Sequence, residues 1–349
     1  MALDCWDGTV TYDQLSDYTS RLGNYLIAHN IGPGVFVPLC FDKSLWAVVS
    51  MLGVQKAGGA FVCIDPAQPV DRLKTIIDEA EAEVVLCAPE YHGMNADSVS
   101  TVVSIDADFI KSLPQCPDLP RRSIPSAPAF AIFTSGSTGK PKGIVHEHRA
   151  MCSSARAHAA KLNMNEGTRA FQFAAYTFIV NTFELFTPLT VGGCVCVPSK
   201  EDRLARTTGA MRDLNANWAC LTPSFLRSLS PEELPQLKTL VLAGEPVQQD
   251  NLDTWRHRVT MVNMYGASEA SLCITGNLSE PVERSTIGKG AGCATWVVDA
   301  NNQNRLAPVG AIGELTVEGP ILAREYLNHP GRTATSFISA TPWLRHMRN

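Results

Sequence analysis

The sequence predicts an α/β protein with stacked, mostly parallel sheets, flanking helices and a small β-rich, barrel-like lobe. Short apolar runs alternate with amphipathic segments along the first 285 residues, a pattern typical of parallel sheets. Several of these runs end in glycine or polar residues, as strands do where ligands bind in open α/β sheets. From 287 onward, short strand-like runs alternate with turn residues. We therefore expect a first α/β subdomain over 1–128, a second over 129–285 and the β-rich lobe over 286–349.

The first part begins with a short strand over 9–12 and an amphipathic helix to about residue 30, for which Asp13 offers an N-terminal cap. The segment 89–128 is rich in proline and lacks long periodicity, so we expect a partly irregular connection there. The further elements expected before it are strands at 35–41, 60–64 and 84–87 and helices at 44–57 and 70–80.

The second part repeats one plan, in which an apolar strand delivers small or polar residues at its carboxyl end. It begins with the apolar run 130–133, which leads directly into a polar loop. The aromatic-rich segment 171–186 lies near its middle. The expected elements are helices at 147–162 and 201–214 and strands at 194–197, 218–223, 238–245 and 259–269.

The loop after Phe133 has the composition of a phosphate-binding site. Thr134–Gly139 is made of hydroxyl residues and glycines, and Lys140 and Lys142 follow. Glycines let backbone N–H groups close around an anion, hydroxyls donate hydrogen bonds and lysines supply charge. The loop is not a P-loop, because Thr134 stands where that motif needs glycine and Pro141 follows Lys140.

Composition excludes several other classes of protein. The formal net charge of −5 gives no reason to expect a nucleic-acid partner. The 11 cysteines include no C-x-x-C pair, which favours reduced thiols in a cytoplasmic protein over disulfides or zinc sites. The N-terminus lacks the pattern of a signal peptide, and there is no run of 18 apolar residues, so we expect no membrane span.

The segment Thr134–Gly143 closely resembles the phosphate-loop signature of the adenylate-forming superfamily, which includes acyl-CoA synthetases, luciferases and the adenylation domains of nonribosomal peptide synthetases. Val10–Leu15 and Lys56–Asp65 look like early core motifs of the same family. Gly143–Ala150 and Val317–Arg324 look closer to peptide synthetases, particularly fungal ones, than to acyl-CoA ligases. The resemblance implies the large N-terminal domain of such an enzyme.

The reaction implied by the resemblance is the activation of a carboxylic acid with ATP and Mg²⁺, giving an acyl-adenylate and pyrophosphate. Because the attacking carboxylate and the α-phosphate are both negative, the site must supply donors and cations. The resemblance places Mg²⁺ on Glu269, adenine on Tyr265 and catalytic roles on Thr138, Lys142 and Glu269. The implied nucleotide-binding residues are Thr134, Ser135, Gly136, Ser137, Thr138, Gly139, Lys142, Gly244, Glu245, Tyr265 and Gly266. We interpret His146 and His148 as structural rather than catalytic.

The resemblance also places an acyl pocket. Relatives that take α-amino acids have an aspartate at the position of Ile179, where it pairs with the substrate ammonium. Burying an unpaired ammonium costs several kcal/mol, so we hypothesise an aryl, anthranilate-like, hydroxy or keto acid. The implied pocket residues are Ile179, Val180, Phe183, Cys220, Val241, Ala243, Met264, Leu272 and Cys273.

The family pattern stops after Leu327, and the ribose-binding aspartate, the hinge and the C-terminal domain with its catalytic lysine do not follow. The sequence also departs from the family at Ala267-Ser268 and at Glu325, where relatives have Pro-Thr and glycine. We therefore expect impaired adenylation in this chain alone and, as partners, a carrier domain or a separately encoded C-terminal domain. A free-standing acyl- or aryl-CoA ligase and a non-catalytic remnant remain the alternatives.

Overall fold

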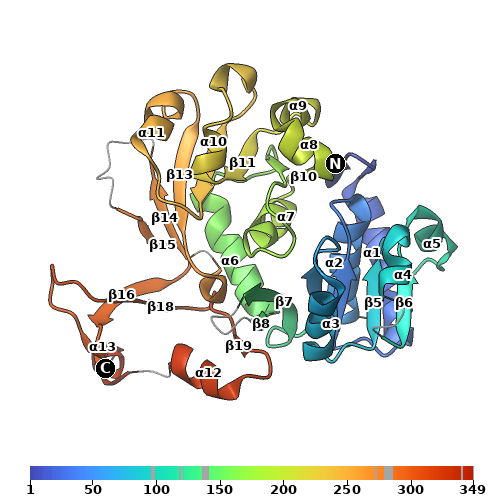
Figure 1. Cartoon of the computed structure of the whole chain (residues 1–349), viewed down its shortest axis with the longest axis horizontal. Helices are drawn as coiled ribbons and strands as arrows, with labels where there is room; N and C mark the ends of the chain where they lie inside the picture. The colour runs from blue at the N-terminus through green and yellow to red at the C-terminus, as the bar shows by residue number, and fades with distance from the viewer. Residues whose placement is uncertain are drawn as a thin grey trace.

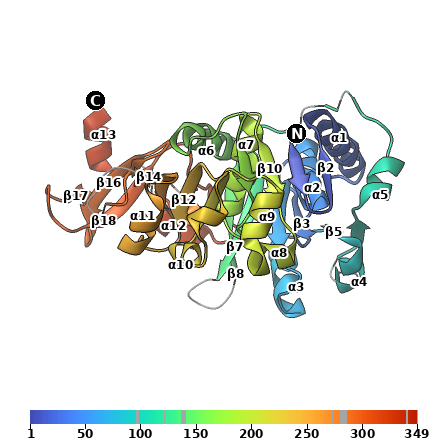
Figure 2. The same ribbon diagram turned by 90° about the horizontal axis from the view of Figure 1, so that it is seen from above.

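The computed structural model describes residues 1–95, 99–117, 119–120, 122–135, 141–271, 273–278, 286–338 and 341–348. In this part of the chain the strands form a seven-stranded, a nine-stranded and a three-stranded sheet. Figure 1 shows the first helices and the seven-stranded sheet at one side and the three-stranded lobe at the other. Helices α6 (His148–Lys161) and α7 (Val180–Thr190) pack against each other between the two large sheets (Figure 2). The mixed α/β architecture expected from the sequence is confirmed.

The seven-stranded sheet has the order β19-β8-β7-β4-β3-β5-β6. Its central strands β7, β4, β3, β5 and β6 are parallel, whereas β8 and β19 are antiparallel additions at one edge. The strands span Phe36–Cys40 (β3), Ala60–Ile64 (β4), Val84–Cys87 (β5), Thr101–Ser104 (β6), Pro128–Ser135 (β7), Pro141–Glu147 (β8) and Glu325–Tyr326 (β19). Strands β6 and β8 were not predicted, because β6 lies in the segment taken as irregular and β8 in the polar stretch after the phosphate loop.

The helices of this half follow the expected pattern with local corrections. Helix α1 is capped by Thr11, whose side chain accepts a hydrogen bond from the Gln14 N–H. The Thr11 N–H in turn donates to the side-chain oxygen of Gln14. The predicted cap at Asp13 is therefore wrong. Helix α2 begins after Ser44 and ends at Gly58, whose φ of 92° favours glycine. The helices are α1 (Tyr12–Ala28), α2 (Leu45–Ala57), α3 (Val70–Glu79), α4 (His92–Asn95) and α5 (Ala107–Ser112).

The nine-stranded sheet has the order β15-β14-β13-β12-β11-β9-β10-β1-β2. Strands β9 to β13 run parallel to one another, so their carboxyl ends meet at one edge. The strands are β1 (Leu3–Cys5), β2 (Gly8–Val10), β9 (Arg169–Phe171), β10 (Cys194–Val197), β11 (Trp218–Leu221), β12 (Thr239–Ala243), β13 (Thr260–Tyr265), β14 (Ile274–Asn277) and β15 (Lys289–Gly290).

Four short helices and two 3₁₀ turns lie in the connections between the strands of this sheet. The helix predicted over 201–214 is two helices, since α8 ends at Ala205 and α9 begins at Thr207. The elements are α8 (Lys200–Ala205), α9 (Thr207–Asp213), α10 (Pro223–Leu226), α11 (Gln249–Trp255) and the 3₁₀ turns Pro231–Glu233 and Ser268–Ala270. A third 3₁₀ turn, Pro89–Tyr91, precedes α4.

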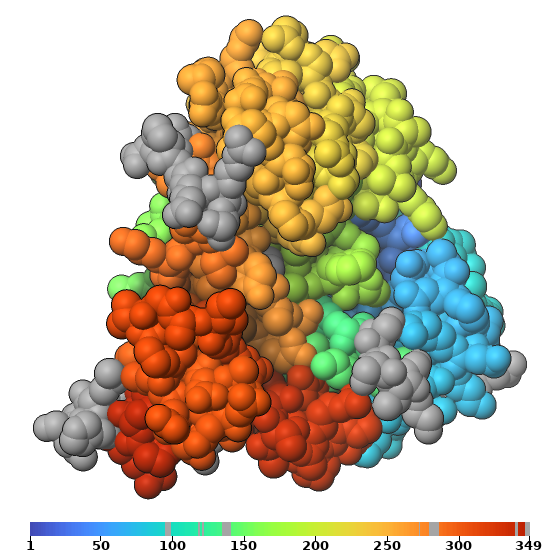
Figure 3. Space-filling model, turned by 60° about the vertical axis from the view of Figure 1, so that its left-hand side comes forward, coloured from blue at the N-terminus to red at the C-terminus, as the bar shows by residue number. Residues whose placement is uncertain are grey.

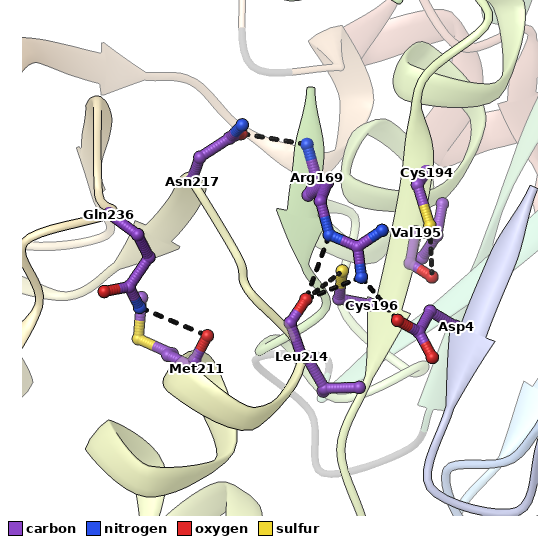
Figure 4. A network of polar contacts seen from close by, with 9 residues as sticks. All are labelled: Asp4, Arg169, Cys194, Val195, Cys196, Met211, Leu214, Asn217 and Gln236. Carbon is purple, nitrogen blue, oxygen red and sulfur yellow. Dashed lines mark hydrogen bonds and ion pairs between the residues drawn. The ribbon is translucent and has the colours of Figure 1, made fainter. Parts of the chain in front are cut away.

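The N-terminal strand β1 is held in the nine-stranded sheet by an arginine. The guanidinium of Arg169 pairs with Asp4 on β1 and donates from Nε to the Leu214 carbonyl at 3.0 Å (Figure 4). The N–H of Arg169 also binds the side-chain oxygen of Asn217 at 2.9 Å. These contacts connect β1 to residues far along the chain. The division into subdomains at 1–128, 129–285 and 286–349 remains a prediction.

The β-rich lobe contains the antiparallel sheet β17-β16-β18. Its strands are β16 (Ala294–Asp299), β17 (Asn302–Leu306) and β18 (Glu314–Glu318), and α12 (Pro330–Ser336) and α13 (Pro342–Arg348) follow. Trp343 packs its ring against Trp296 with a centroid distance of 5.1 Å, which holds α13 on this sheet. None of the helices in the described part of the chain is long and apolar enough to cross a membrane.

Candidate active site

Two segments far apart in the sequence meet between the large sheets. The 3₁₀ turn Ser268–Ala270, which follows β13, carries Glu269, and Lys142 lies at the start of β8. Lys142 Nζ donates to Glu269 Oε1 at 3.0 Å. Lys142 lies opposite Thr134 in the β7–β8 ladder, so the end of the predicted phosphate loop and the predicted Mg²⁺ ligand are neighbours. Figure 3 shows a hollow on one face of the molecule, with mid-chain residues at its bottom and the blue, orange and red segments around it.

A tyrosine that sequence reasoning missed completes this ion pair. The Tyr326 hydroxyl donates to Glu269 Oε1 at 2.8 Å, and Lys142 Nζ lies 4.3 Å from the centre of the Tyr326 ring. Burial opposes both charges, but the hydrogen bonds outweigh it, lowering the pKa of Glu269 and raising the pKa of Lys142. The carboxylate is therefore held ionised. No motif marks Tyr326, because β19 reaches the site only through its pairing with β8.

His146 positions the turn that carries Glu269. Its Nε2 lies 2.8 Å from the Ser268 carbonyl, which only accepts, so Nε2 carries the proton and Nδ1 accepts from the Ser271 hydroxyl at 3.3 Å. The ring is fully buried and stacks on Phe130 at 4.7 Å between ring centres. Burial lowers the pKa of His146 to about 4, so the imidazole is neutral. His146 is a positioning residue, and the strand that carries it was not predicted from the sequence.

The phosphate loop is described in part. Gly136, Ser137, Thr138 and Gly139 lie outside the described residues, as does the side chain of Ser135. At the start of the loop, Thr134 Oγ1 is buried and has no hydrogen-bond partner among the described residues. An orphaned hydroxyl beside Lys142 and an ionised carboxylate fits a phosphate chain with a hard cation, because phosphate accepts from hydroxyl and ammonium groups and Mg²⁺ takes carboxylate oxygen.

The residues predicted for the adenine side lie at the ends of two neighbouring strands. Ala243 and Met264 are paired in the β12–β13 ladder, which brings Gly244-Glu245 beside Tyr265-Gly266. Tyr265 is 48% exposed, so its ring has a free face. The Glu245 carboxylate accepts from the Ser224 N–H at 3.0 Å and from the Ser224 hydroxyl, which lowers the pKa of Glu245. Gly244 has φ of 86°, a conformation that favours glycine.

Most of the predicted acyl-pocket residues lie together on one face of the nine-stranded sheet. Cys220 pairs with Val241 and Ala243 pairs with Met264, and side chains two apart on a strand share a face. Phe183 on α7 covers this face, with its ring centre 6.0 Å from that of Trp218. One apolar cluster contains Ile179, Phe183, Cys220, Val241, Ala243 and Met264, with Val180 packed against it.

Two predicted pocket residues are placed differently. Leu272 lies outside the described residues. Cys273 is buried in a separate small cluster with Ala270, Ile274 and Ile321, next to the Glu269 turn. Ile179 stands at the N-cap position of α7, where its side chain makes no capping hydrogen bond. An apolar side chain within an apolar cluster therefore occupies the position at which the sequence comparison predicts the partner of a substrate ammonium.

A buried polar group behind the pocket was missed as well. Lys43 Nζ donates to the Ala174 carbonyl at 2.7 Å and to the Gln172 side-chain oxygen, and Gln172 Nε2 donates to Glu184 Oε2 at 2.9 Å. Burial lowers the pKa of Lys43 to about 7 and raises the pKa of Glu184 to about 7. We call Lys43, Gln172 and Glu184 the buried relay. The sequence does not predict this relay, because its three residues belong to separate elements and form no local sequence pattern.

The fold and these contacts define an adenylate-forming enzyme domain. A family model described as AMP-binding enzyme matches residues 2–327, so the chain belongs to this family. Among curated relatives, the nonribosomal peptide synthetase apmB of Penicillium brevicompactum is 74% identical over 347 residues, covering 99% of this chain and 15% of that protein. The N-benzoylphenylalaninol synthetase apmA of the same fungus is 44% identical, over 100% of this chain and 15% of that protein.

Solved structures of related enzymes match this chain in fold. The nonribosomal peptide synthetase FmoA3 in its α-methyl-L-serine-AMP bound form matches with a TM-score of 0.87 and 26% identity, over 97% of this chain and 39% of that one. VinN matches in fold, with a TM-score of 0.86 and 21% identity, over 97% of this chain and 89% of that one. The chain thus spans 15% of the length of the two curated relatives, and it resembles fungal peptide synthetases over its whole length.

Proposed function

We propose that this chain is the large part of an adenylation domain that activates a carboxylic acid with ATP for nonribosomal peptide synthesis. The 3.0 Å contact between Lys142 and Glu269 carries the proposal, because it joins the phosphate loop to the predicted metal ligand. FmoA3, a relative in fold solved with α-methyl-L-serine-AMP and with AMPPNP, supports the use of ATP.

The side chains have separate roles in this proposal. Glu269 would hold Mg²⁺, and Thr134 with Lys142 would bind phosphate oxygens. Bound ATP·Mg²⁺ would supply an electrophilic α-phosphorus and neutralise the phosphate charge. Tyr326 and His146 keep the Glu269 carboxylate and its turn in place through contacts of 2.8 Å each. Tyr265 offers an exposed ring for adenine.

We further propose that the acid lacks an α-ammonium group. Ile179 and its neighbours make the pocket face apolar, so an ammonium there would be buried without a partner, at a cost of several kcal/mol. The 44%-identical relative is named for a product with a benzoyl group, which supports an aryl acid within the class of aryl, hydroxy and keto acids.

Titration calorimetry with ATP·Mg²⁺ tests the nucleotide site. We expect Glu269→Gln to weaken binding by about tenfold or more, because a neutral amide is a poor ligand for a hard cation. Glu325→Gln is the matched control, since Glu325 pairs with the neighbouring Arg324 at 3.0 Å. Equal affinities of wild type and Glu269→Gln would reject the proposed metal site.

ATP–pyrophosphate exchange with a panel of acids tests the reaction, using this chain alone and with a C-terminal adenylation subdomain added. We expect slow exchange with this chain alone and faster exchange once the C-terminal subdomain has been added. A preference for an ordinary α-amino acid would reject the proposed substrate class. Transfer of the acyl group to coenzyme A rather than to a carrier protein would favour an acyl-CoA ligase. Absence of both ATP binding and exchange under every condition would favour a non-catalytic remnant.

A further inference from the structure

Two cysteines meet where the nine-stranded sheet leads into the β-rich lobe. Cys273 directly precedes β14 and Cys293 directly precedes β16. Cys293 Sγ lies 3.1 Å from the Cys273 carbonyl oxygen, and the two thiol groups are hydrogen-bonded to each other. Two residues that are 20 positions apart in the sequence thus lie within hydrogen-bond distance of each other.

A glycine turn makes this contact possible. Gly290 pairs with Ile274, and the Ala291 N–H donates to the Cys273 carbonyl at 2.7 Å. A Cβ atom at Gly290 would lie 2.4 Å from the Cys293 carbonyl oxygen and 3.2 Å from its sulfur. Any larger residue at Gly290 would therefore push Cys293 away from Cys273.

The two thiols differ in accessibility. Cys273 is 1% exposed and packs against Ala270 and Ile321, whereas Cys293 is half-buried. The hydrogen bond from Cys273 lowers the pKa of Cys293 to about 7 and raises that of Cys273. A partly exposed thiol next to a second, buried thiol is the arrangement of an attacking and a resolving cysteine.

Two other close cysteine pairs lack this accessibility. Cys40 and Cys87 are partners in the β3–β5 ladder and are both fully buried, and the neighbouring thiols of Cys194 and Cys196 are buried as well. Cys194 and Cys196 stand two apart on β10 and are 5% and 0% exposed (Figure 4). Side chains at such positions project in parallel from Cα atoms about 6.6 Å apart, near the upper limit for a disulfide and with unsuitable directions. Their burial also denies access to an oxidant.

We propose that Cys273 and Cys293 form an intramolecular disulfide when the protein meets a peroxide. The Cys293 thiolate attacks one peroxide oxygen, so an S–O bond forms, the O–O bond breaks and hydroxide leaves. The Cys273 sulfur then attacks the Cys293 sulfur, forming S–S and breaking S–O. The hydroxyl leaves as water with the Cys273 proton. Two thiols lose two electrons and hydrogen peroxide becomes two waters.

The bond changes the proposed active site. Cys273 packs against Ala270, the last residue of the turn that carries Glu269, so a covalent bond to Cys293 changes the support of that turn. We expect oxidation to lower acid-dependent exchange at least fivefold and dithiothreitol to restore it. This part rests on the proposed function, whereas formation of the disulfide does not.

Peptide mapping by mass spectrometry after hydrogen peroxide treatment and alkylation tests the bond. We expect a linked Cys273–Cys293 peptide that dithiothreitol removes. Cys293→Ser abolishes the link and makes exchange insensitive to peroxide. Cys152→Ser, at an exposed thiol, is the matched control that changes neither.

Alkylated or overoxidised Cys293 without a link would overturn the proposal, and so would equal linkage of Cys194 to Cys196. A link that leaves exchange unchanged would overturn the effect on the proposed active site. If the reduced protein exchanges with no acid, the proposed function fails, and the peptide map still decides the disulfide.

Discussion

At the scale of one residue, the proposed substrate class depends on Ile179. It is buried at the N-terminal end of α7, within the apolar cluster that contains Phe183 and Met264. A carboxylate introduced there would have an incoming ammonium as its partner. An isoleucine at this position would instead pack against a hydrocarbon or aromatic surface of the substrate.

We predict that Ile179→Asp shifts the preference in pyrophosphate exchange toward α-amino acids by about 10- to 100-fold relative to aryl acids, the size of a charged hydrogen bond. Ile179→Asn is the control, because asparagine has nearly the shape of aspartate but no charge. It should shift the substrate preference much less. Relative kcat/KM values for benzoate and phenylalanine measure the change. An unchanged ratio in Ile179→Asp would place the acid elsewhere.

His146 gives a prediction about pH. Its pKa is about 4 in the folded protein against about 6.5 when unfolded. The unfolded state therefore binds more protons between these values. The stability contributed by the neutral, buried ring is complete above pH 6.5 and is lost as the pH falls toward 4, by about 3 kcal/mol in all.

Urea unfolding of wild type and His146→Asn at several pH values tests this prediction. We expect His146→Asn to be less stable at pH 7 and to lose less stability between pH 7 and pH 5. His29→Asn, at an exposed helix end, is the control and should follow wild type. Parallel curves for wild type and His146→Asn would contradict the assignment.

At the scale of elements, strand β8 connects the parts of the site. It pairs with β7 on one side and β19 on the other, so it carries Lys142 and His146 and brings Tyr326 to Glu269. Gly143 permits this close pairing. A Cβ atom there would lie 2.9 Å from Phe133 Cζ and 3.1 Å from Leu327 Cβ.

We predict that Gly143→Ala destabilises the protein by about 1–3 kcal/mol, the usual cost of overpacking a core, and weakens ATP·Mg²⁺ binding, because β8 shifts. Gly93→Ala, with open space around its Cβ position, is the control and should be neutral or slightly stabilising. Thermal unfolding and calorimetry measure the two effects. A fully stable Gly143→Ala variant would show that β7 and β19 adapt without cost.

Sequence reasoning was successful where chemistry follows a strand directly. Glu269 and Lys142 were predicted to lie close together and are joined by a hydrogen bond, and the residues predicted for the pocket on β11, β12 and β13 share a face of the sheet. It failed where a strand depends on distant pairing. Strand β8 is polar at its start, and β6 has only β5 as its neighbour. Tyr326 and the buried relay act through side chains brought together by the fold, which spacing along the chain does not reveal.

At the scale of the molecule, the buried relay joins the two large sheets. Lys43 follows β3 of the seven-stranded sheet, Gln172 follows β9 of the nine-stranded sheet, and Glu184 lies on α7. All three are buried. The relay therefore fixes the spacing of the sheets, and with it the distance between the phosphate loop and the pocket face.

We predict that Lys43→Met and Glu184→Gln each destabilise the protein, Lys43→Met by about 3–5 kcal/mol, because each leaves a buried polar group without its partner. The double variant should lose at least about 1 kcal/mol less than the sum of the two. Denaturant unfolding of the wild type, the two single variants and the double variant measures this double-mutant cycle. Strict additivity would show that the residues act independently.

The pairing of β1 with β10 has a consequence for biosynthesis. Leu3 lies opposite Val195, so β1 gains its parallel neighbour only after β10, far along the chain, has been made. Contacts of such long separation form slowly, and an unpaired apolar strand is a site for aggregation in the meantime. A nascent chain halted before β10 should thus engage chaperones through β1, and release them once β10 can pair with it.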